Sequence, residues 1–153
     1  MNVKIFPRKF QWLNLFWQLL VIMMCTSSCT VQLVPPYDPE IEHAIIDAAR
    51  QSDRLYMEMI NAPDDKKLFG IYKDKYLSVA VEINSLLLRN ETRPKADHIV
   101  SSITKLKNFF FSAMEDHKKR EVLNNAELIL YHEQLKAFWK PVLVEEMALK
   151  KAM

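Results

Sequence analysis

The segment HEQLK, His132–Lys136, places a histidine and a glutamate as they stand at the start of a zinc-protease metal site. A His-Glu-x-x-His segment holds zinc because its two histidines, four residues apart, lie on one face of a helix. Here the second of those positions is Lys136, and an ammonium group cannot ligate a metal. We therefore expect His132 and Glu133 to lie on a solvated helix face, and we predict no zinc protease.

A second arrangement, Glu40 followed three residues later by His43, matches half of a di-iron carboxylate site. Such sites in helical bundles use two Glu-x-x-His pairs and two further glutamates, all directed inward. No glutamate stands three positions before His98, His117 or His132. We expect Glu40 and His43 to serve the first turn of a helix, and we predict no metal and no cofactor.

Sulfur ligands give no stronger signal. Cys25 and Cys29 form a CxxxC pair with no histidine after it, so covalent haem attachment is not supported. Met57 and Met59 could suggest a soft copper site, but residues two apart do not share a helix face. We expect Met59 to fill space in the core, as methionine often does.

Composition excludes further classes of function. Gly70 is the only glycine in 153 residues, so no P-loop and no Rossmann fingerprint is present. Three of the 21 basic residues lie in the first nine positions, which leaves 18 basic and all 19 acidic residues in residues 29–153, a net charge of −1. Such a chain has no electrostatic footprint for nucleic acid. With no catalytic set in the spacing, we also predict that it is not an enzyme.

The first thirty residues have an organisation of their own. The early basic residues are followed by an apolar run, FQWLNLFWQLLVIMMC, and then by Thr26, Ser27 and Ser28 directly before Cys29. This is the order of a secretory signal, and the apolar run is shorter than the ~20 residues that span a bilayer comfortably. An uncleaved signal anchor is the alternative.

The end of this region resembles the lipobox of bacterial lipoproteins, in which small residues precede an invariant cysteine. The resemblance implies a signal peptide at residues 1–28, cleavage between Ser28 and Cys29, and lipidation of Cys29 by a diacylglyceryl group and an N-acyl group such as palmitate. Thr26 departs from the leucine most often found there. Several acyl chains on one cysteine anchor a protein durably, whereas one chain binds marginally. Thr30, in place of a retaining aspartate, implies an outer-membrane lipoprotein facing the periplasm, if the source is Gram-negative.

The rest of the chain divides into the lipidated cysteine with an extended tether, residues 29–37, and a helical body, residues 38–153. Pro35 and Pro36 disfavour helix, and seven extended residues span at most about 25 Å. The body begins at Asp38, a predicted helix N-cap whose carboxylate can accept a backbone N–H. Proline at the next position fits the first turn of a helix.

Apolar residues in the body recur at alternating steps of three and four, which predicts amphipathic helices. Their breaks are NAPDD, RNETRP and HKKREVLNN, with Asn124 or Asn125 as the last cap. We predict an all-α, antiparallel up-down-up-down four-helix bundle whose last helix is kinked at Pro141 but continuous. The predicted core positions are Ile41, Ile45, Ala48, Ser52, Leu55, Met59, Phe69, Tyr72, Tyr76, Val79, Ile83, Leu86, Ile99, Ile103, Leu106, Phe110, Ala113, Leu128, Tyr131, Leu135, Phe138, Val142 and Leu149.

Aromatic residues beside the predicted core admit two interpretations. Phe109 and Phe111 flank Phe110 and cannot both point fully inward, and Trp139 flanks Phe138 in the same way. One interpretation is a wide buried face. The other is an exposed patch of Phe109, Phe111 and Trp139 that binds a partner or a second copy.

The sequence Tyr37-Asp38-Pro39 after a short tether, together with LLLR at Leu86–Arg89, resembles a group of small, uncharacterised, all-helical bacterial lipoproteins. That resemblance implies no known activity. Our first hypothesis is a lipid-anchored, non-enzymatic interaction or structural module of the cell envelope, which binds an envelope protein or itself. The alternative is a carrier that holds a small apolar ligand inside the bundle, in a void lined by Tyr72, Tyr76, Phe110 and Phe138.

Overall fold

The computed structural model describes Gln18 and residues 34–151, so the predicted signal peptide, the cleavage after Ser28 and the lipidated Cys29 lie outside the described residues. Within residues 34–151, α2 (Pro39–Asn61), α3 (Phe69–Glu91), α4 (Asp97–Arg120) and α5 (Asn125–Lys151) are α-helices. A short 3-10 turn, η1 (Asp64–Lys66), lies between α2 and α3. No strand occurs in this part of the chain, and the predicted all-α class is confirmed.

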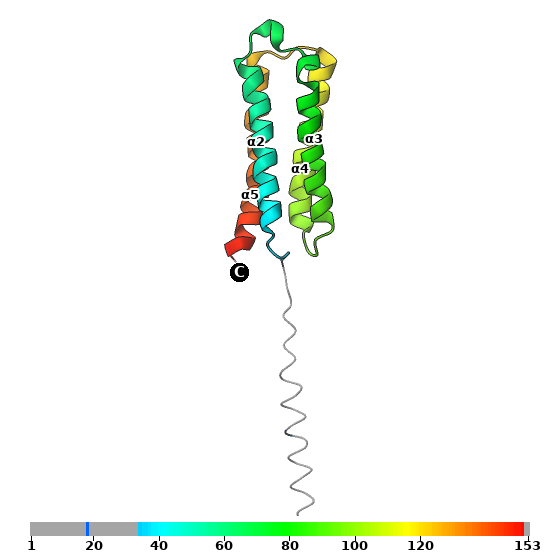
Figure 1. Ribbon diagram of the computed structural model, residues 1–153, viewed down its shortest axis with the longest axis vertical. Coiled ribbons are helices and arrows are strands. Elements are labelled where there is room, and N and C mark those ends of the chain that lie inside the picture. Colours follow the sequence, from blue (N-terminus) through cyan, green and yellow to red (C-terminus); the bar gives the residue numbers. More distant parts are fainter. Residues whose placement is uncertain (1–17, 19–33, 152–153) are drawn as a thin grey trace, which may run out of the picture. The chain divides into compact units, whose positions relative to one another are not determined.

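The helices form an antiparallel bundle in which each packs against two neighbours. α3 and α5 both pack against α2, and both also pack against α4 (Figure 1). The start of α2, the α3–α4 connection and the end of α5 lie together at one end, which we call the proximal end. The α2–α3 and α4–α5 connections lie at the distal end. This is the predicted up-down-up-down arrangement.

Heptad-like spacing builds the core on three of the helices as predicted. Every predicted core position of α2 and α4 is buried, and on α3 only Phe69 is partly exposed. The buried stripe then continues one step further than predicted, to Asn90 on α3 and to His117 on α4. The apolar core therefore ends in polar side chains that need partners.

α5 faces the core differently from the prediction. Its buried positions are Leu128, His132, Leu135, Trp139, Val142, Glu146 and Leu149. Tyr131 and Phe138, predicted to point inward, are half-buried on the flank toward α4, where their ring centroids lie 6.2 and 5.0 Å from that of Phe109. The expectation of a solvated His132 is wrong, because this side chain lies on the buried flank toward α2.

The predicted aromatic partner surface is not assembled. Trp139 is 6% exposed, and its indole N–H donates to the Ser52 hydroxyl at 2.8 Å, so its placement on a surface is wrong. The indole N–H finds its partner inside the bundle, which explains the burial. Phe109 and Phe111 are partly buried and packed against the core. A wide buried face is therefore the better description of these side chains.

The helix ends follow local hydrogen-bonding rules. Asp38 caps α2 as predicted, accepting the Glu40 N–H at 2.8 Å. At the start of α5, Asn124 and Glu127 each accept the other's backbone N–H at 3.0 Å, the reciprocal pattern of a capping box. α4 runs to Arg120, through the first residues of the predicted break.

Pro141 lies inside α5 without ending it, so the predicted continuity is confirmed. The proline is on the exposed side of the helix, where a missing backbone N–H bond costs less than it would in the core. The kink at this residue stays a prediction.

Candidate functional site

A buried ion pair at the proximal end holds the start of the body. Arg93, in the α3–α4 connection, donates from both terminal nitrogens to the Glu146 carboxylate of α5, at 2.8 and 3.2 Å. The same guanidinium donates to the carbonyl of Pro36 at 2.5 Å and to Asn90 Oδ1 at 2.8 Å. Glu146 also accepts the backbone N–H of Asp38 at 3.3 Å. We call Pro36, Asp38, Arg93 and Glu146 the N-terminal clamp.

The burial of the clamp decides its energetic weight. Glu146 has no exposed side-chain surface and Arg93 has 9%. A buried charge is tolerated only when it is paired, and the planar guanidinium suits a carboxylate because it can form two parallel hydrogen bonds. The clamp therefore ties the segment before α2, the α3–α4 connection and α5 to one another.

Tyr37 adds a more exposed layer to the clamp. Its hydroxyl donates to the Glu42 carboxylate, to which Lys150 of α5 donates at 2.9 Å. The Lys150 ammonium also lies 5.5 Å from the centroid of the Tyr37 ring. Hydrogen bonds from Tyr37 and then Lys150 lower the pKa of Glu42. Each residue of Tyr37-Asp38-Pro39 thus has a role, since Tyr37 joins α2 to α5, Asp38 caps α2 and Pro39 begins it.

The distal end holds a second buried polar cluster, centred on His117. Its Nε2 lies 2.9 Å from the Lys67 carbonyl, and its Nδ1 lies 3.1 Å from the Tyr76 hydroxyl. Because a carbonyl only accepts, Nε2 carries the proton and Nδ1 accepts from Tyr76. The Lys67 ammonium, on a side chain that is 2% exposed, donates to Asp64 at 2.6 Å and also to Asn125. Burial lowers the pKa of His117. The hydrogen bond to the Lys67 carbonyl raises this pKa, but by less than burial lowers it.

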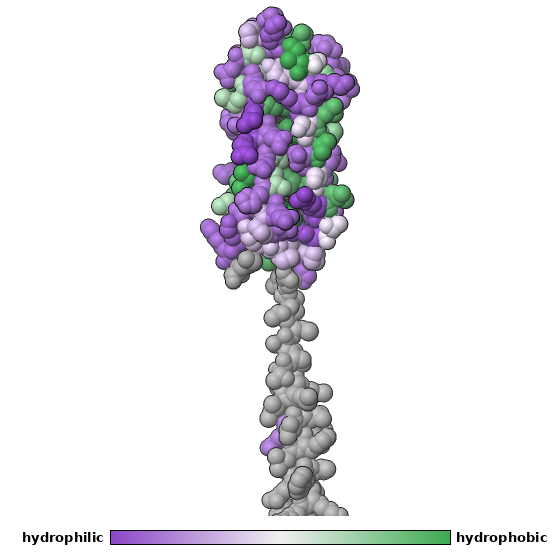
Figure 2. All heavy atoms as spheres, in the orientation of Figure 1, coloured by the Kyte–Doolittle hydropathy of each residue, from purple (hydrophilic) through white to green (hydrophobic). Residues whose placement is uncertain are grey.

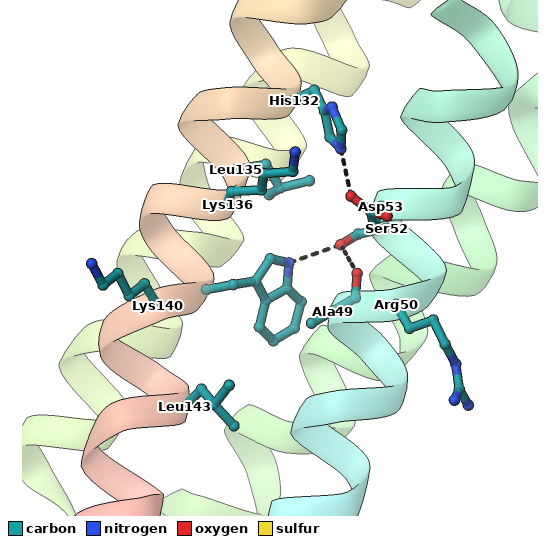
Figure 3. Close-up of a pocket in the computed structure, with 10 residues that line it drawn as sticks. Ala49, Arg50, Ser52, Asp53, His132, Leu135, Lys136, Lys140 and Leu143 are labelled. Carbon is teal, nitrogen blue, oxygen red and sulfur yellow. Dashed lines mark hydrogen bonds and ion pairs between the residues drawn. The ribbon is translucent and has the colours of Figure 1, made fainter. Parts of the chain in front are cut away.

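Between α2 and α5 the surface is hollowed into a groove of about 410 Å³ (Figure 3). The polar groups of its floor are bonded within the fold. Trp139 donates to Ser52, Ser52 donates to the Ala49 carbonyl at 2.7 Å, and His132 Nε2 lies 2.6 Å from Asp53 Oδ1. The groove is lined by Ala49, Arg50, Ser52, Asp53, His132, Leu135, Lys136, Trp139, Lys140 and Leu143.

The residues first considered for metal chemistry do not come together. Glu40 and His43 are exposed in the first turn of α2. Within the described residues, no three or more His, Cys, Asp or Glu side chains are grouped so that they could hold a metal ion. None of the described helices combines the length and the apolar character that a membrane crossing requires.

Sequence reasoning missed Arg93 and Glu146 of the clamp and His117 and Lys67 of the distal cluster. For His117 and Glu146, a signal was available in their positions along the helices. The buried positions of α4 and α5 recur every three or four residues and are mostly apolar, but they include His117, His132 and Glu146. A polar residue at such a position points inward and needs a partner. No protein-family model, curated protein or solved structure matches this chain, so its function is argued from these contacts.

Replacing Glu146 by glutamine should lower the free energy of unfolding by about 3–5 kcal/mol, because Arg93 would keep its buried charge and lose its counterion. The double variant Arg93→Met/Glu146→Leu should cost less than the two single changes added together. Urea unfolding followed by circular dichroism measures both effects. The control is Glu115→Gln, which breaks an exposed pair with Lys118 and should change stability by at most about 1 kcal/mol. A Glu146→Gln effect no larger than the control would contradict the clamp.

The lowered pKa of His117 makes stability depend on pH. The unfolded chain takes up a proton on this residue near pH 6.5, whereas the folded chain resists it until a lower pH. The contribution is therefore fully present above about pH 6.5 and is lost as the pH falls below that value. We expect urea unfolding between pH 7.5 and 5 to show a smaller slope for His117→Gln than for the wild type. His98→Gln, at an exposed position, is the control. Equal slopes for wild type and His117→Gln would refute this assignment.

Proposed function

We propose that this chain is a lipid-anchored, non-enzymatic protein of the cell envelope, held by acyl chains on Cys29 in the outer membrane and facing the periplasm. The observation that carries the proposal is the short distance in sequence between the cysteine and the body. Pro35 is the first buried residue of the described body, six residues after Cys29. Six extended residues span at most about 21 Å, so a body anchored at Cys29 stays near the membrane surface.

The non-enzymatic part of the proposal is supported by the use made of buried polar groups. General acid–base catalysis needs a polar side chain within reach of a substrate. Two of the described buried groups are used within the fold. His117 is bonded to Tyr76 and to the Lys67 carbonyl, and Glu146 is bonded to Arg93. These bonds hold helices and connections together, which is a structural use of the side chains.

The interaction part of the proposal is supported by an apolar face of α3. Leu77, Val81 and Leu88 are 47, 63 and 64% exposed. They lie on one side of the helix because they are spaced by four and seven residues. Figure 2 shows apolar side chains along the side of the molecule where α3 lies. Exposed apolar side chains on one helix face favour protein contact, so this face replaces Trp139 as the candidate surface for an envelope protein or a second copy.

The carrier hypothesis finds less support inside the bundle. The rings of Tyr76 and Phe110 pack on each other with centroids 5.8 Å apart, while Phe138 stacks on Phe109. Three of the predicted lining residues, Tyr76, Phe110 and Phe138, are thus in contact with other rings. The groove between α2 and α5 is the feature that favours binding of a ligand.

Mass spectrometry of the mature N-terminus tests the anchor. We expect the wild type to begin at an acylated Cys29 and to partition into the detergent phase, and Cys29→Ala to lose both the modification and the partitioning. Cys25→Ala is the matched control and should behave as wild type. Recovery of an unmodified N-terminus, or membrane attachment of Cys29→Ala equal to that of the wild type, would refute the lipoprotein assignment.

Cross-linking in intact envelopes tests the α3 face. We expect the wild type to form a reproducible cross-linked species, either a dimer or a complex with one envelope protein, and Val81→Glu/Leu88→Glu to lose it because charge on an apolar contact is costly. Lys105→Glu, an exposed change on α4, is the control. A wild type without any reproducible cross-linked species would contradict the interaction role.

A further inference from the structure

We infer that the groove between α2 and α5 is a binding site for a fatty acid, whose acyl chain lies on the apolar floor and whose carboxylate binds the basic edge. A volume of about 410 Å³ is in the range of small-ligand pockets. Trp139, Leu135, Ala49 and Leu143 supply the apolar part of the lining. This inference goes beyond the proposed function and does not depend on how Cys29 is processed.

The floor favours an acyl chain because the polar groups of Trp139 and Ser52 are bonded within the fold, which leaves the exposed Asp53 carboxylate at the side of the groove as its acidic group. The Trp139 indole N–H is used by Ser52, and the Ser52 hydroxyl by the backbone of Ala49. His132 lies against Asp53 and stacks on Tyr56, with ring centroids 6.1 Å apart. A sugar or an extended peptide would leave its own polar groups without partners here, at a cost that an alkyl chain does not have.

The edge of the groove selects an anionic head group. Lys136 and Lys140 extend from α5 and Arg50 from α2, and Figure 3 shows the Lys140 and Arg50 side chains directed to opposite sides of the groove. Asp53, which pairs with His132, is the one acidic residue of the lining, against these three basic residues. Arg50 and Lys136 have exposed carboxylate neighbours, at 2.7 and 3.1 Å. Lys140 is exposed and has no ion pair among the described residues. Lys140, four residues after Lys136 on the same side of α5, is therefore the cation at this edge that is available to a carboxylate.

The dimensions favour one acyl chain over a protein helix. Along α5 the groove runs from His132 to Leu143, eleven residues, which is about 16 Å at ~1.5 Å per residue. A stable protein interface buries about 800 Å² on each partner, which needs a broader surface than a groove between two helices. A single chain of about a dozen carbons suits the length.

Tryptophan fluorescence tests this site directly. The only tryptophans are Trp12, Trp17 and Trp139, so Trp12→Phe/Trp17→Phe in the full chain leaves Trp139 as the one reporter. We expect 11-bromoundecanoate, below the concentration at which it aggregates, to quench Trp139 saturably, and laurate to reverse the quenching by competition. Dodecyltrimethylammonium, with the same alkyl length and the opposite charge, should compete at least about tenfold more weakly, since it would meet like charge.

Substitutions in this background separate the two parts of the site. Lys140→Glu should weaken laurate binding by about fivefold, whereas Lys73→Glu, a charge-matched change on exposed α3 surface, should leave it unchanged. Ala49→Phe should fill the groove and abolish the quenching. If the larger side chain perturbs folding, Leu143→Gln is the second variant, which should weaken binding because it places a polar amide on the apolar floor. Circular dichroism and thermal unfolding confirm that each variant is folded. Absence of saturable quenching, equal binding of the cationic amphiphile, or equal effects of Lys140→Glu and Lys73→Glu would overturn the proposal.

Discussion

A carboxylate with no exposed surface, Glu146, lies against the Arg93 guanidinium, the kind of partner that a buried charged group requires. This pair requires the face of α5 that carries Glu146 to point inward. Trp139 and His132 are seven and fourteen positions before Glu146, so a helix that points Glu146 inward points them inward as well. On the flank toward α2 they meet Asp53 and Ser52, and the groove follows from that contact. The ion pair at the proximal end and the groove further along the bundle thus use the same face of α5.

The same requirement explains what could be predicted from sequence. In α5, two patterns of alternating three- and four-residue steps share Leu128, Leu135, Val142 and Leu149. The first pattern adds Tyr131 and Phe138. The second adds His132, Trp139 and Glu146. Hydropathy favours the first pattern, and the structure buries the second. α5 has two neighbours, so one flank packs on α4 through the aromatic rings and the other on α2 through polar bonds. The helices, their order and the cores of α2 and α4 follow from apolar spacing alone. Arg93 and Lys67 could not be found that way, because a charged residue in a connection carries no periodic signal.

Buried polar groups lie at both ends of the bundle. Asn90 and Glu146 extend the core stripe at the proximal end, and His117 does so at the distal end. The distal cluster also joins two connections, since the N–H of Phe69 donates to the carbonyl of Glu121 at 2.9 Å. At the proximal end, the clamp also holds the backbone of Pro36 and Asp38, which precede α2. In a lipid-anchored protein this would join the anchor to the whole body rather than to α2 alone.

Hydrogen exchange at the Asp38 amide tests the clamp most directly, because this N–H donates to Glu146 from outside the helix. If the segment before α2 is fixed to the bundle, the Asp38 amide should exchange on the order of a hundredfold more slowly than that of exposed Val34. Equal exchange at Asp38 and Val34, in a protein whose helices are protected, would show that the segment is not held and would contradict this account.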